Sequence, residues 1–296
     1  MFTLLLILSL MGCSRVKFAY NQLDWLIPYY TKDYLELSDS QRSYLDEAVN
    51  DLLYWHCGNH LGAYAKLMRE TNQNFQRLDM DDEKLRLLIA AIDNYWKEIK
   101  RQASPAIAKL FATSSRQQID EMFSRLQEMN EEWLEEYNAQ TRGAWRKKRE
   151  LEMIDELERW FGPLHAGQQE AVSNWSRQLL PLGKMYLEAR QQWQRRLHEL
   201  LLHRTDPAVF AAGLERLFVD PEELYSSDYQ QRLETNHQFT INMVAEIGRL
   251  LDENQKRHLD KTIRNIADDL DELACRGESK PQVRASTSTG FPLIGY

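Results

Sequence analysis

Residues 251–273 read LDENQKRHLDKTIRNIADDLDEL, and their pattern decides the class of fold. Apolar side chains recur at intervals of three or four residues, at Leu259, Ile263, Ile266, Leu270 and Leu273. This period places them on one face of an α-helix. Such a face must be buried against a neighbour, so the stretch predicts a helix that packs against other helices.

Three earlier segments repeat the pattern, and each is expected to bury its apolar face. The stripes are Leu45, Ala48, Val49, Leu52 and Leu53; Leu85, Leu88, Ile89, Ile92, Trp96 and Ile99; and Ile119, Met122, Phe123, Leu126, Trp133 and Tyr137. No segment alternates convincingly as a strand would, and Gly (12) and Pro (8) are sparse. The sequence therefore predicts an all-α fold, a multi-helix bundle or a helical-repeat-like array of amphipathic helices.

Proline and glycine predict where the helices break, because proline lacks the amide donor of a helix interior. Phe161-Gly162-Pro163 is the clearest break, and we expect a sub-boundary near residues 162–164. Pro181 is expected to bend a long helix that runs to about His203. Pro28 is expected to break the first helical segment, Gly58 to interrupt or end the second, and Pro105 to kink or end the third. Helix starts are expected at Asp206-Pro207 and Asp220-Pro221.

The N-terminal stretch MFTLLLILSLMGC predicts a lipoprotein signal peptide, residues 1–12, followed by a lipidated Cys13. Its apolar run is shorter than the roughly 20 residues that span a bilayer, and it has the length of a signal-peptide core. The triad Leu10-Met11-Gly12 forms the lipobox. No Lys or Arg precedes the run, so an ordinary N-terminal helix with a chance cysteine stays an alternative.

The residues after the anchor give the expected compartment and domain plan. By resemblance to bacterial lipoprotein sorting, Ser14 at the second mature position implies the outer membrane, with the protein facing the periplasm. Stable anchoring takes more than one acyl chain.

Residues 13–276 are expected to form the helical domain. Residues 277–296 mix Ser, Thr, Gly and Pro without periodicity and predict a disordered tail.

Five aromatic residues crowd the first mature segment: Tyr20, Trp25, Tyr29, Tyr30 and Tyr34. We expect them to pack on the helical body. The alternative is contact with lipid headgroups, where Trp and Tyr are favoured.

Cys57 and Cys275 remain once Cys13 carries lipid. A disulfide would suit an oxidising periplasm, but sequence alone does not bring the two together. Two inert, partly buried thiols are the favoured alternative.

A helix-start motif recurs along the chain, in which Leu and a polar cap precede Gln. The copies are Leu37, Ser38 and Gln41; Leu164, His165 and Gln168; Leu251, Asp252 and Gln255; and a looser one from Ala112 to Gln117. A short polar cap accepts from the third helical amide while Gln bonds back to the cap amide. His165 is a poor cap, and such boxes start helices in many proteins without any further function.

The motif resembles the Leu-Thr-x-x-Gln signature of CpxP/Spy-like periplasmic helical proteins. That resemblance implies envelope-stress sensing or chaperoning of unfolded periplasmic clients. These relatives are small, and this chain carries Ser or Asp where they have Thr.

A fuller resemblance rests on the block from Cys13 to Leu26, on Tyr34 to Ser38, on Trp55-His56 and on Glu158-Arg159-Trp160. Together with the Leu-x-x-x-Gln starts, these resemble an uncharacterised family of proteobacterial envelope lipoproteins, known as a domain of unknown function. The resemblance is expected to cover nearly the whole mature chain to about Cys275. It implies a helical, envelope-located protein and supplies no activity.

The search for reactive chemistry finds only weak patterns. His56 and His60 have the i,i+4 spacing of metal ligands, but no third ligand is identifiable. Glu234 and His237 form one copy of a motif that di-iron bundles use twice. Nucleotide, hydrolase and phosphate-binding motifs are missing. We therefore predict no cofactor, no metal site and no catalytic residue.

The overall charge of −8 argues against a nucleic-acid partner, which normally meets a basic patch. The basic run from Arg146 to Arg149 is flanked by acids and fits a solvated helix face. We expect an outer-membrane lipoprotein that acts by binding protein, in a chaperone-like or envelope-stress role. The alternatives are a scaffold lipoprotein with one fixed envelope partner and an enzyme of unfamiliar type.

Overall fold

A computed structural model describes residues 15–204 and 206–275 of the 296-residue chain. Within these ranges the chain forms α-helices and one 3-10 helix, and no strand, so the predicted all-α fold is confirmed. The elements are α1 (Arg15–Tyr20), α2 (Leu23–Thr31), α3 (Asp39–Asn59), α4 (Leu61–Gln76), α5 (Asp82–Thr113), α6 (Arg116–Ala139), α7 (Arg142–Phe161), α8 (Ala166–Gln178), α9 (Gly183–Leu202), α10 (Pro207–Val219), η1 (Pro221–Leu224), α11 (Ser227–Arg249) and α12 (Glu253–Leu273).

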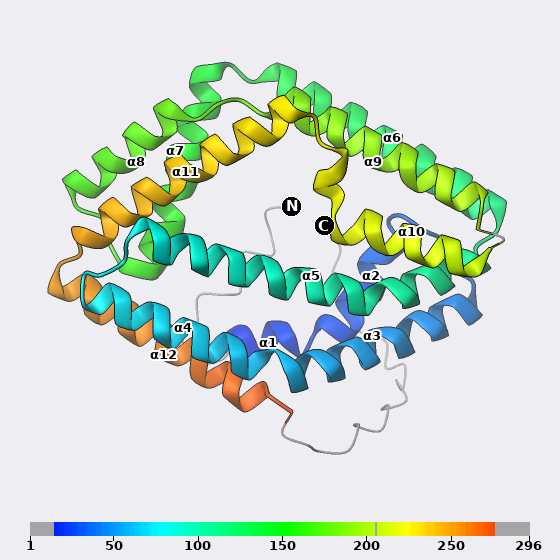
Figure 1. Cartoon of the computed structure of the whole chain (residues 1–296), viewed down its shortest axis with the longest axis horizontal. Coiled ribbons are helices and arrows are strands. Elements are labelled where there is room, and N and C mark those ends of the chain that lie inside the picture. The colour runs from blue at the N-terminus through cyan, green and yellow to red at the C-terminus, as the bar shows by residue number, and fades with distance from the viewer. Residues whose placement is uncertain (1–14, 205, 276–296) are drawn as a thin grey trace, which may run out of the picture.

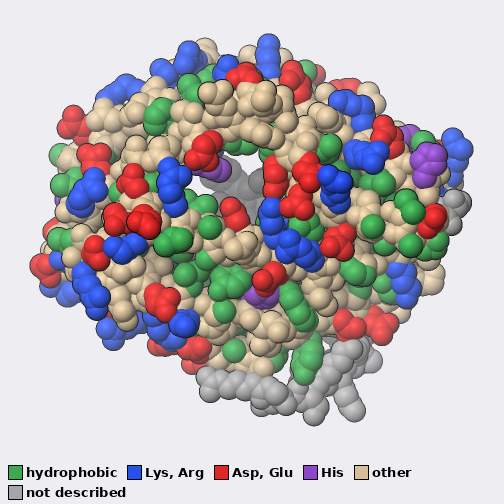
Figure 2. All heavy atoms as spheres, in the orientation of Figure 1, with side chains coloured by type: hydrophobic (Ala, Val, Ile, Leu, Met, Phe, Trp, Pro, Cys, Tyr) green, Lys and Arg blue, Asp and Glu red, His purple; other side chains and the backbone are tan. Residues whose placement is uncertain are grey.

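The helices are arranged around a central opening (Figure 1). The α6–α9 pair forms one side, α7, α8 and α11 form the next, and α4 with α12 and α3 closes the ring. Helix α5 crosses the molecule beside α10 and borders the opening. Figure 2 shows this opening near the centre of the same face, with acidic and basic side chains around it.

Two large apolar clusters hold the ring together. The first joins α4, the start of α5 through Leu85, α7, α8, α11 and α12, and the second joins α3, α5, α6, α9 and α10. Phe161 and Leu164 both lie in the first cluster, so the helices before and after residues 162–164 share one core. No helix in the described ranges has the length and apolar character needed to cross a bilayer.

The structure corrects several expected breaks. Pro28 lies inside α2, and α5 continues past Pro105 to Thr113. The boundary between α3 and α4 falls at His60, just beyond Gly58. The expected long helix around Pro181 is two helices, because α8 ends at Gln178 and α9 begins at Gly183.

The two Asp-Pro starts behave differently. The Asp206 carboxylate accepts hydrogen bonds from the amides of Ala208 and Val209 and caps α10. Pro221 begins only the four-residue 3-10 helix η1. An N-terminal Pro fixes the first φ angle but does not supply the packing that prolongs a helix.

One predicted stripe is buried only in part. Leu85 of α5 is buried, but Ile89 and Ile92 are exposed and Trp96 is 58% exposed. The expectation that this whole face packs against a neighbour is wrong, because α5 crosses the ring and borders the opening. In α12, by contrast, Leu259 and Ile263 are buried as predicted.

Cys57 and Cys275 form a disulfide, which corrects the favoured expectation of two separate thiols. The bond joins α3 to the end of the described chain just after α12, across 218 residues of sequence. Sequence could not reveal this pair, because only the packing of α12 against α4 brings the two cysteines together.

Candidate functional site

The Leu-x-x-x-Gln motifs meet in pairs. Gln41 and Gln118 exchange hydrogen bonds, with Nε2-to-Oε1 distances of 3.3 and 2.8 Å. Each amide oxygen also accepts from its own cap amide, that of Ser38 at 2.9 Å and that of Ser115 at 2.8 Å. The looser fourth copy therefore uses Gln118, not the expected Gln117.

A second Gln pair joins two helix starts in the C-terminal half of the chain. Gln168 and Gln255 exchange hydrogen bonds of 3.0 and 2.8 Å. The amides of His165 and Asp252 donate to the same two oxygens, at 3.1 and 3.2 Å. Leu164 and Leu251 are both buried in the first core cluster beside this pair.

The pair of Gln168 and Gln255 serves structure and not recognition. Gln168 is 0% exposed and Gln255 is 3% exposed, so no ligand from outside reaches their amides. The His165 ring donates through Nε2 to the carbonyl of Leu250, 3.1 Å away. Each motif thus joins two helix starts that are distant in sequence, and the surface of the protein must be searched elsewhere for a binding site.

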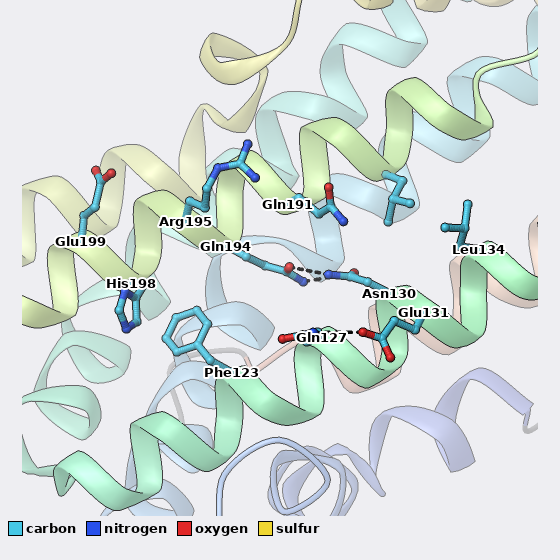
Figure 3. Close-up of a pocket in the computed structure, with 11 residues that line it drawn as sticks. Phe123, Gln127, Asn130, Glu131, Leu134, Gln191, Gln194, Arg195, His198 and Glu199 are labelled. Atoms are coloured by element: carbon cyan, nitrogen blue, oxygen red, sulfur yellow. Dashed lines mark hydrogen bonds between the residues drawn. The ribbon is translucent and has the colours of Figure 1, made fainter.

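The clearest hollow runs between α6 and α9 and is called here the α6–α9 groove (Figure 3). Its polar end has a volume of 630 Å³, and a second hollow of 680 Å³ lies where the C-terminal end of α6 meets α7, the segment between α8 and α9, the start of α9 and α11; this second hollow is called here the aromatic end. Both volumes lie in the range of ligand sites, about 300–1,000 Å³. The polar end is lined by Phe123, Gln127, Asn130, Glu131, Leu134, Leu187, Gln191, Gln194, Arg195, His198 and Glu199.

A buried amide pair forms the floor of the polar end. Asn130 of α6 and Gln194 of α9 point at each other across the groove (Figure 3). The Asn130 Nδ2 donates to Gln194 Oε1 at 2.7 Å, and Gln194 Nε2 donates back at 3.4 Å. The two amides are buried and bonded to each other, so they join α6 and α9 beneath the groove. Phe123 and His198 close its far end in an edge-to-face contact of 4.7 Å.

Aromatic rings line the other end of the groove. Trp133 stacks on Tyr137 with ring centroids 5.2 Å apart, and Trp133 lies 5.5 Å from Tyr186. Trp145 and Tyr229 complete the aromatic lining. Burial raises the pKa of the Tyr229 hydroxyl, so this group stays protonated and can donate a hydrogen bond at neutral pH.

Two local features shape the walls of the aromatic end. A Cβ on Gly183 would lie 2.1 Å from Cε2 of Tyr137, so only glycine lets the Tyr137 ring approach the start of α9. The Asn236 side chain bonds both backbone groups of Leu180, accepting from its amide at 2.9 Å and donating to its carbonyl at 2.9 Å. These two hydrogen bonds fix the segment between α8 and α9, which forms one wall of the aromatic end.

The aromatic end is cationic within an acidic protein. Its lining includes Arg142 and Arg149 and contains no Asp or Glu. Arg149 pairs with Glu152 at 3.2 Å, whereas Arg142 is exposed and has no ion pair with any residue in the described ranges. Aromatic faces and guanidinium groups are the residue types that dominate binding energy at protein interfaces.

The two histidines with metal-ligand spacing lie in an aromatic cluster. His56 contacts the hydroxyls of Tyr20 and Tyr64, at 3.0 and 3.2 Å, through its two ring nitrogens. His60 is 2% exposed and its Nε2 lies 2.9 Å from Glu98 Oε2. Burial lowers the pKa of His56 to about 4 and raises that of Tyr20 to about 12. The hydroxyl contacts occupy both nitrogens of His56.

No three His, Cys, Asp or Glu side chains in the part of the chain described here are grouped to hold a metal ion. Glu234 pairs with Arg86 at 3.3 Å, so it does not face an inward cluster with His237. Arg146 of the basic run donates to the carbonyl of Arg177 at 2.7 Å, and its Nε is buried. Cys13 lies outside the described residues.

Sequence reasoning missed the groove. Trp133 and Tyr137 were assigned to a core stripe, yet both are only half-buried and line a hollow. Their i,i+4 spacing placed both rings on one helix face but did not show whether a neighbouring helix covers them. Gly183 and Asn236 gave no signal, because their roles depend on contacts distant in sequence.

The comparisons with known proteins give a family and nothing more specific. A family described as a family of unknown function (DUF6279) matches residues 33–230, which is more than half of the chain. The match is narrower than the expected resemblance, since it leaves out the block from Cys13 to Leu26 and helix α12. No curated protein and no solved structure matches the chain. The chain belongs to the family of unknown function DUF6279.

Proposed function

We propose that this protein is a proteobacterial outer-membrane lipoprotein, anchored by acyl chains on Cys13, whose helical ring faces the periplasm and binds other proteins. The proposal for the compartment is supported by the signal-peptide pattern of residues 1–13 and by Ser14. The Cys57–Cys275 disulfide is compatible with an oxidising compartment.

The anchor is tested by metabolic labelling. Labelled palmitate is expected to enter the wild-type protein and not the Cys13→Ala variant, because the thiol is the attachment atom. Fractionation of the same cells is expected to place the wild-type protein with outer membranes. Label in the Cys13→Ala variant, or none in the wild type, contradicts the anchor.

We assign the binding activity to the α6–α9 groove. The observation that supports this assignment is the set of aromatic and cationic side chains that line its aromatic end. Three rings with centroids 5.2 and 5.5 Å apart offer apolar contact to side chains, and Arg142 offers an unpaired guanidinium. The amides of the polar end, among them Gln127 and Gln191, offer partners to an extended peptide backbone. The ligand that fits is an extended polypeptide segment with apolar side chains and a carboxylate.

Two substitutions test this assignment without touching the core. Tyr186→Ala removes a ring that is exposed, and Arg142→Glu reverses the unpaired charge. Site-specific photo-crosslinkers at these two positions in cells are expected to capture protein partners. In binding assays with a chemically unfolded model protein, each substitution is expected to weaken affinity by roughly tenfold or more, as loss of aromatic or Arg anchors does.

Matched controls come from exposed positions outside the groove. Trp96→Ala removes an exposed ring from α5, and Arg116→Glu reverses an exposed charge at the start of α6. Both controls are expected to bind like the wild type. Equal loss in controls and groove variants contradicts the groove as the binding site.

The range of partners separates the alternative roles. A chaperone-like protein suppresses aggregation of several unrelated unfolded clients at near-stoichiometric amounts. A scaffold suppresses none and captures one fixed envelope partner through the same groove. An enzyme of unfamiliar type loses its cellular role on one polar substitution that leaves stability and crosslinking unchanged.

A further inference from the structure

Helix α2 presents an aromatic face that the helical body does not cover. No residue of α2 is buried, and Trp25 is 51%, Tyr29 48% and Tyr30 52% exposed. Phe18 and Tyr34, just before and after α2, are exposed as well. These residues form what is called here the aromatic face. Of the five aromatic residues expected to pack on the body, Tyr20 contacts His56, whereas the expectation is wrong for the exposed Trp25, Tyr29, Tyr30 and Tyr34.

The rings of this face contact one another. Trp25 and Tyr29 lie edge to face at 6.0 Å, and Tyr29 and Tyr30 at 5.4 Å. The Lys32 ammonium lies 3.6 Å from the centre of the Tyr29 ring. A cluster of Trp and Tyr differs from an uncovered stripe of Ile and Leu, because each ring combines an apolar body with a polar tip and suits a boundary between hydrocarbon and water.

The body holds this face close to the anchor. Lys17 of α1 pairs with Asp269 at 3.1 Å and with Glu272 at 2.6 Å, both on α12. The Tyr20 hydroxyl contacts His56 of α3 at 3.0 Å. Helix α1 begins at Arg15, only two residues after Cys13, and two extended residues reach at most about 7 Å. An acylated Cys13 therefore leaves α1, α2 and the attached ring within reach of the membrane surface.

From this geometry we propose that the aromatic face lies in the headgroup layer of the lipid membrane that holds the anchor, and so fixes the orientation of the helical ring. This inference rests on the proposed anchoring at Cys13. The aromatic face binds because its rings partition into the interface between the lipid headgroups and the acyl chains. Its neighbouring charges, Asp24, Lys32 and Asp33, are mixed in sign, so binding does not require anionic lipid.

Quenching by lipid brominated near the top of its acyl chains tests the contact directly, because it reports indoles that reach the boundary between headgroups and acyl chains. The acylated mature protein is reconstituted in phosphatidylcholine vesicles with and without brominated chains, and its tryptophan emission is compared. The chain has eight Trp residues, so the assignment comes from single variants. Trp25→Phe is expected to lose the quenching. Trp96→Phe, which alters an exposed ring remote from the anchor in sequence, is expected to keep it.

A second variant and a second readout separate the outcomes. Tyr29→Ser with Tyr30→Ser is expected to weaken quenching of Trp25, while circular dichroism verifies the helical fold. Flotation with the vesicles reports the anchor itself. Protein that floats without Trp25-dependent quenching overturns this inference alone, and protein that does not float overturns the anchoring and the inference together.

Discussion

Gln168 and Gln255 exchange two hydrogen bonds across the start of α8 and the start of α12, 87 residues apart in sequence. Gln41 and Gln118 make the same exchange 77 residues apart. The correspondence extends to the backbone. Gln118 donates to the carbonyl of Glu36 and Gln255 to that of Pro163, each two residues before the partner motif's N-cap. Each half of the chain thus contains one Gln pair, and in each pair the same set of hydrogen bonds joins two helix starts.

Loss of one amide from this joint is expected to destabilise the protein. Gln168→Ala leaves the buried amide of Gln255 without its partner, at a cost of about 1–3 kcal/mol in the free energy of unfolding. Urea denaturation measures the change. The double variant Gln168→Ala with Gln255→Ala is expected to cost less than the two single changes summed, because it leaves no orphaned amide. Gln117→Ala, at an exposed position beside Ser115, is the control and is expected to change little.

The disulfide is expected to contribute to stability, because it links residues 218 apart and restricts the unfolded chain. Cys57→Ala with Cys275→Ala is expected to lower the unfolding free energy by about 2–4 kcal/mol. Thermal unfolding with and without reductant measures the effect on the wild type. A melting temperature that reductant leaves unchanged contradicts the bond. Cys13→Ala serves as the control, since it removes a thiol that does not belong to the pair.

Stability is expected to fall as the pH drops from about 6.5 towards 4, with His56 contributing. Burial lowers its pKa from 6.5 in the unfolded chain to about 4 in the folded protein. Between these values the unfolded state binds the proton and the folded state does not, so acid favours unfolding. Tyr20, Tyr64 and His60 contact the ring, and no carboxylate within residues 15–204 and 206–275 is hydrogen-bonded to it.

Urea midpoints at pH 7 and pH 5 measure this dependence. In the His56→Asn variant the loss of stability between the two values is expected to be smaller than in the wild type. His237→Asn, at an exposed position, is the matched control. A pH dependence equal in wild type and His56→Asn contradicts the assignment, as does an NMR titration in which His56 gains its proton near pH 6.5.

Gly183→Ala is expected to close the aromatic end of the groove. The added methyl group would lie 2.1 Å from Tyr137, so the ring must turn away from Trp133. Overpacking of this kind costs typically about 1–3 kcal/mol of stability. Near-ultraviolet circular dichroism reports the displaced ring, and partner binding is expected to fall with it. Gly62→Ala, whose Cβ would meet no atom within 4 Å, is the control and is expected to preserve both signals.

Local structure followed closely from local sequence. The stripe of α12, the capping boxes at Ser38 and Asp252 and the Asp206 cap all rest on contacts within one helical turn. A residue's nearest neighbours in the chain decide such contacts, so the pattern predicts them. Pro28 misled, because α2 continues through it, and of the two outcomes expected at Pro105 the end of the helix does not occur, because α5 continues to Thr113.

By itself the sequence determined an all-helical chain, the positions of most helices and the motifs that start them. Only the tertiary structure decided that the Gln motifs pair, that Cys57 meets Cys275, that α6 and α9 leave a groove, and that α2 keeps its rings exposed. The physical reason is that helical periodicity defines which face of a helix is apolar but not which surface covers it. That choice depends on packing between segments distant in sequence, which no local pattern encodes.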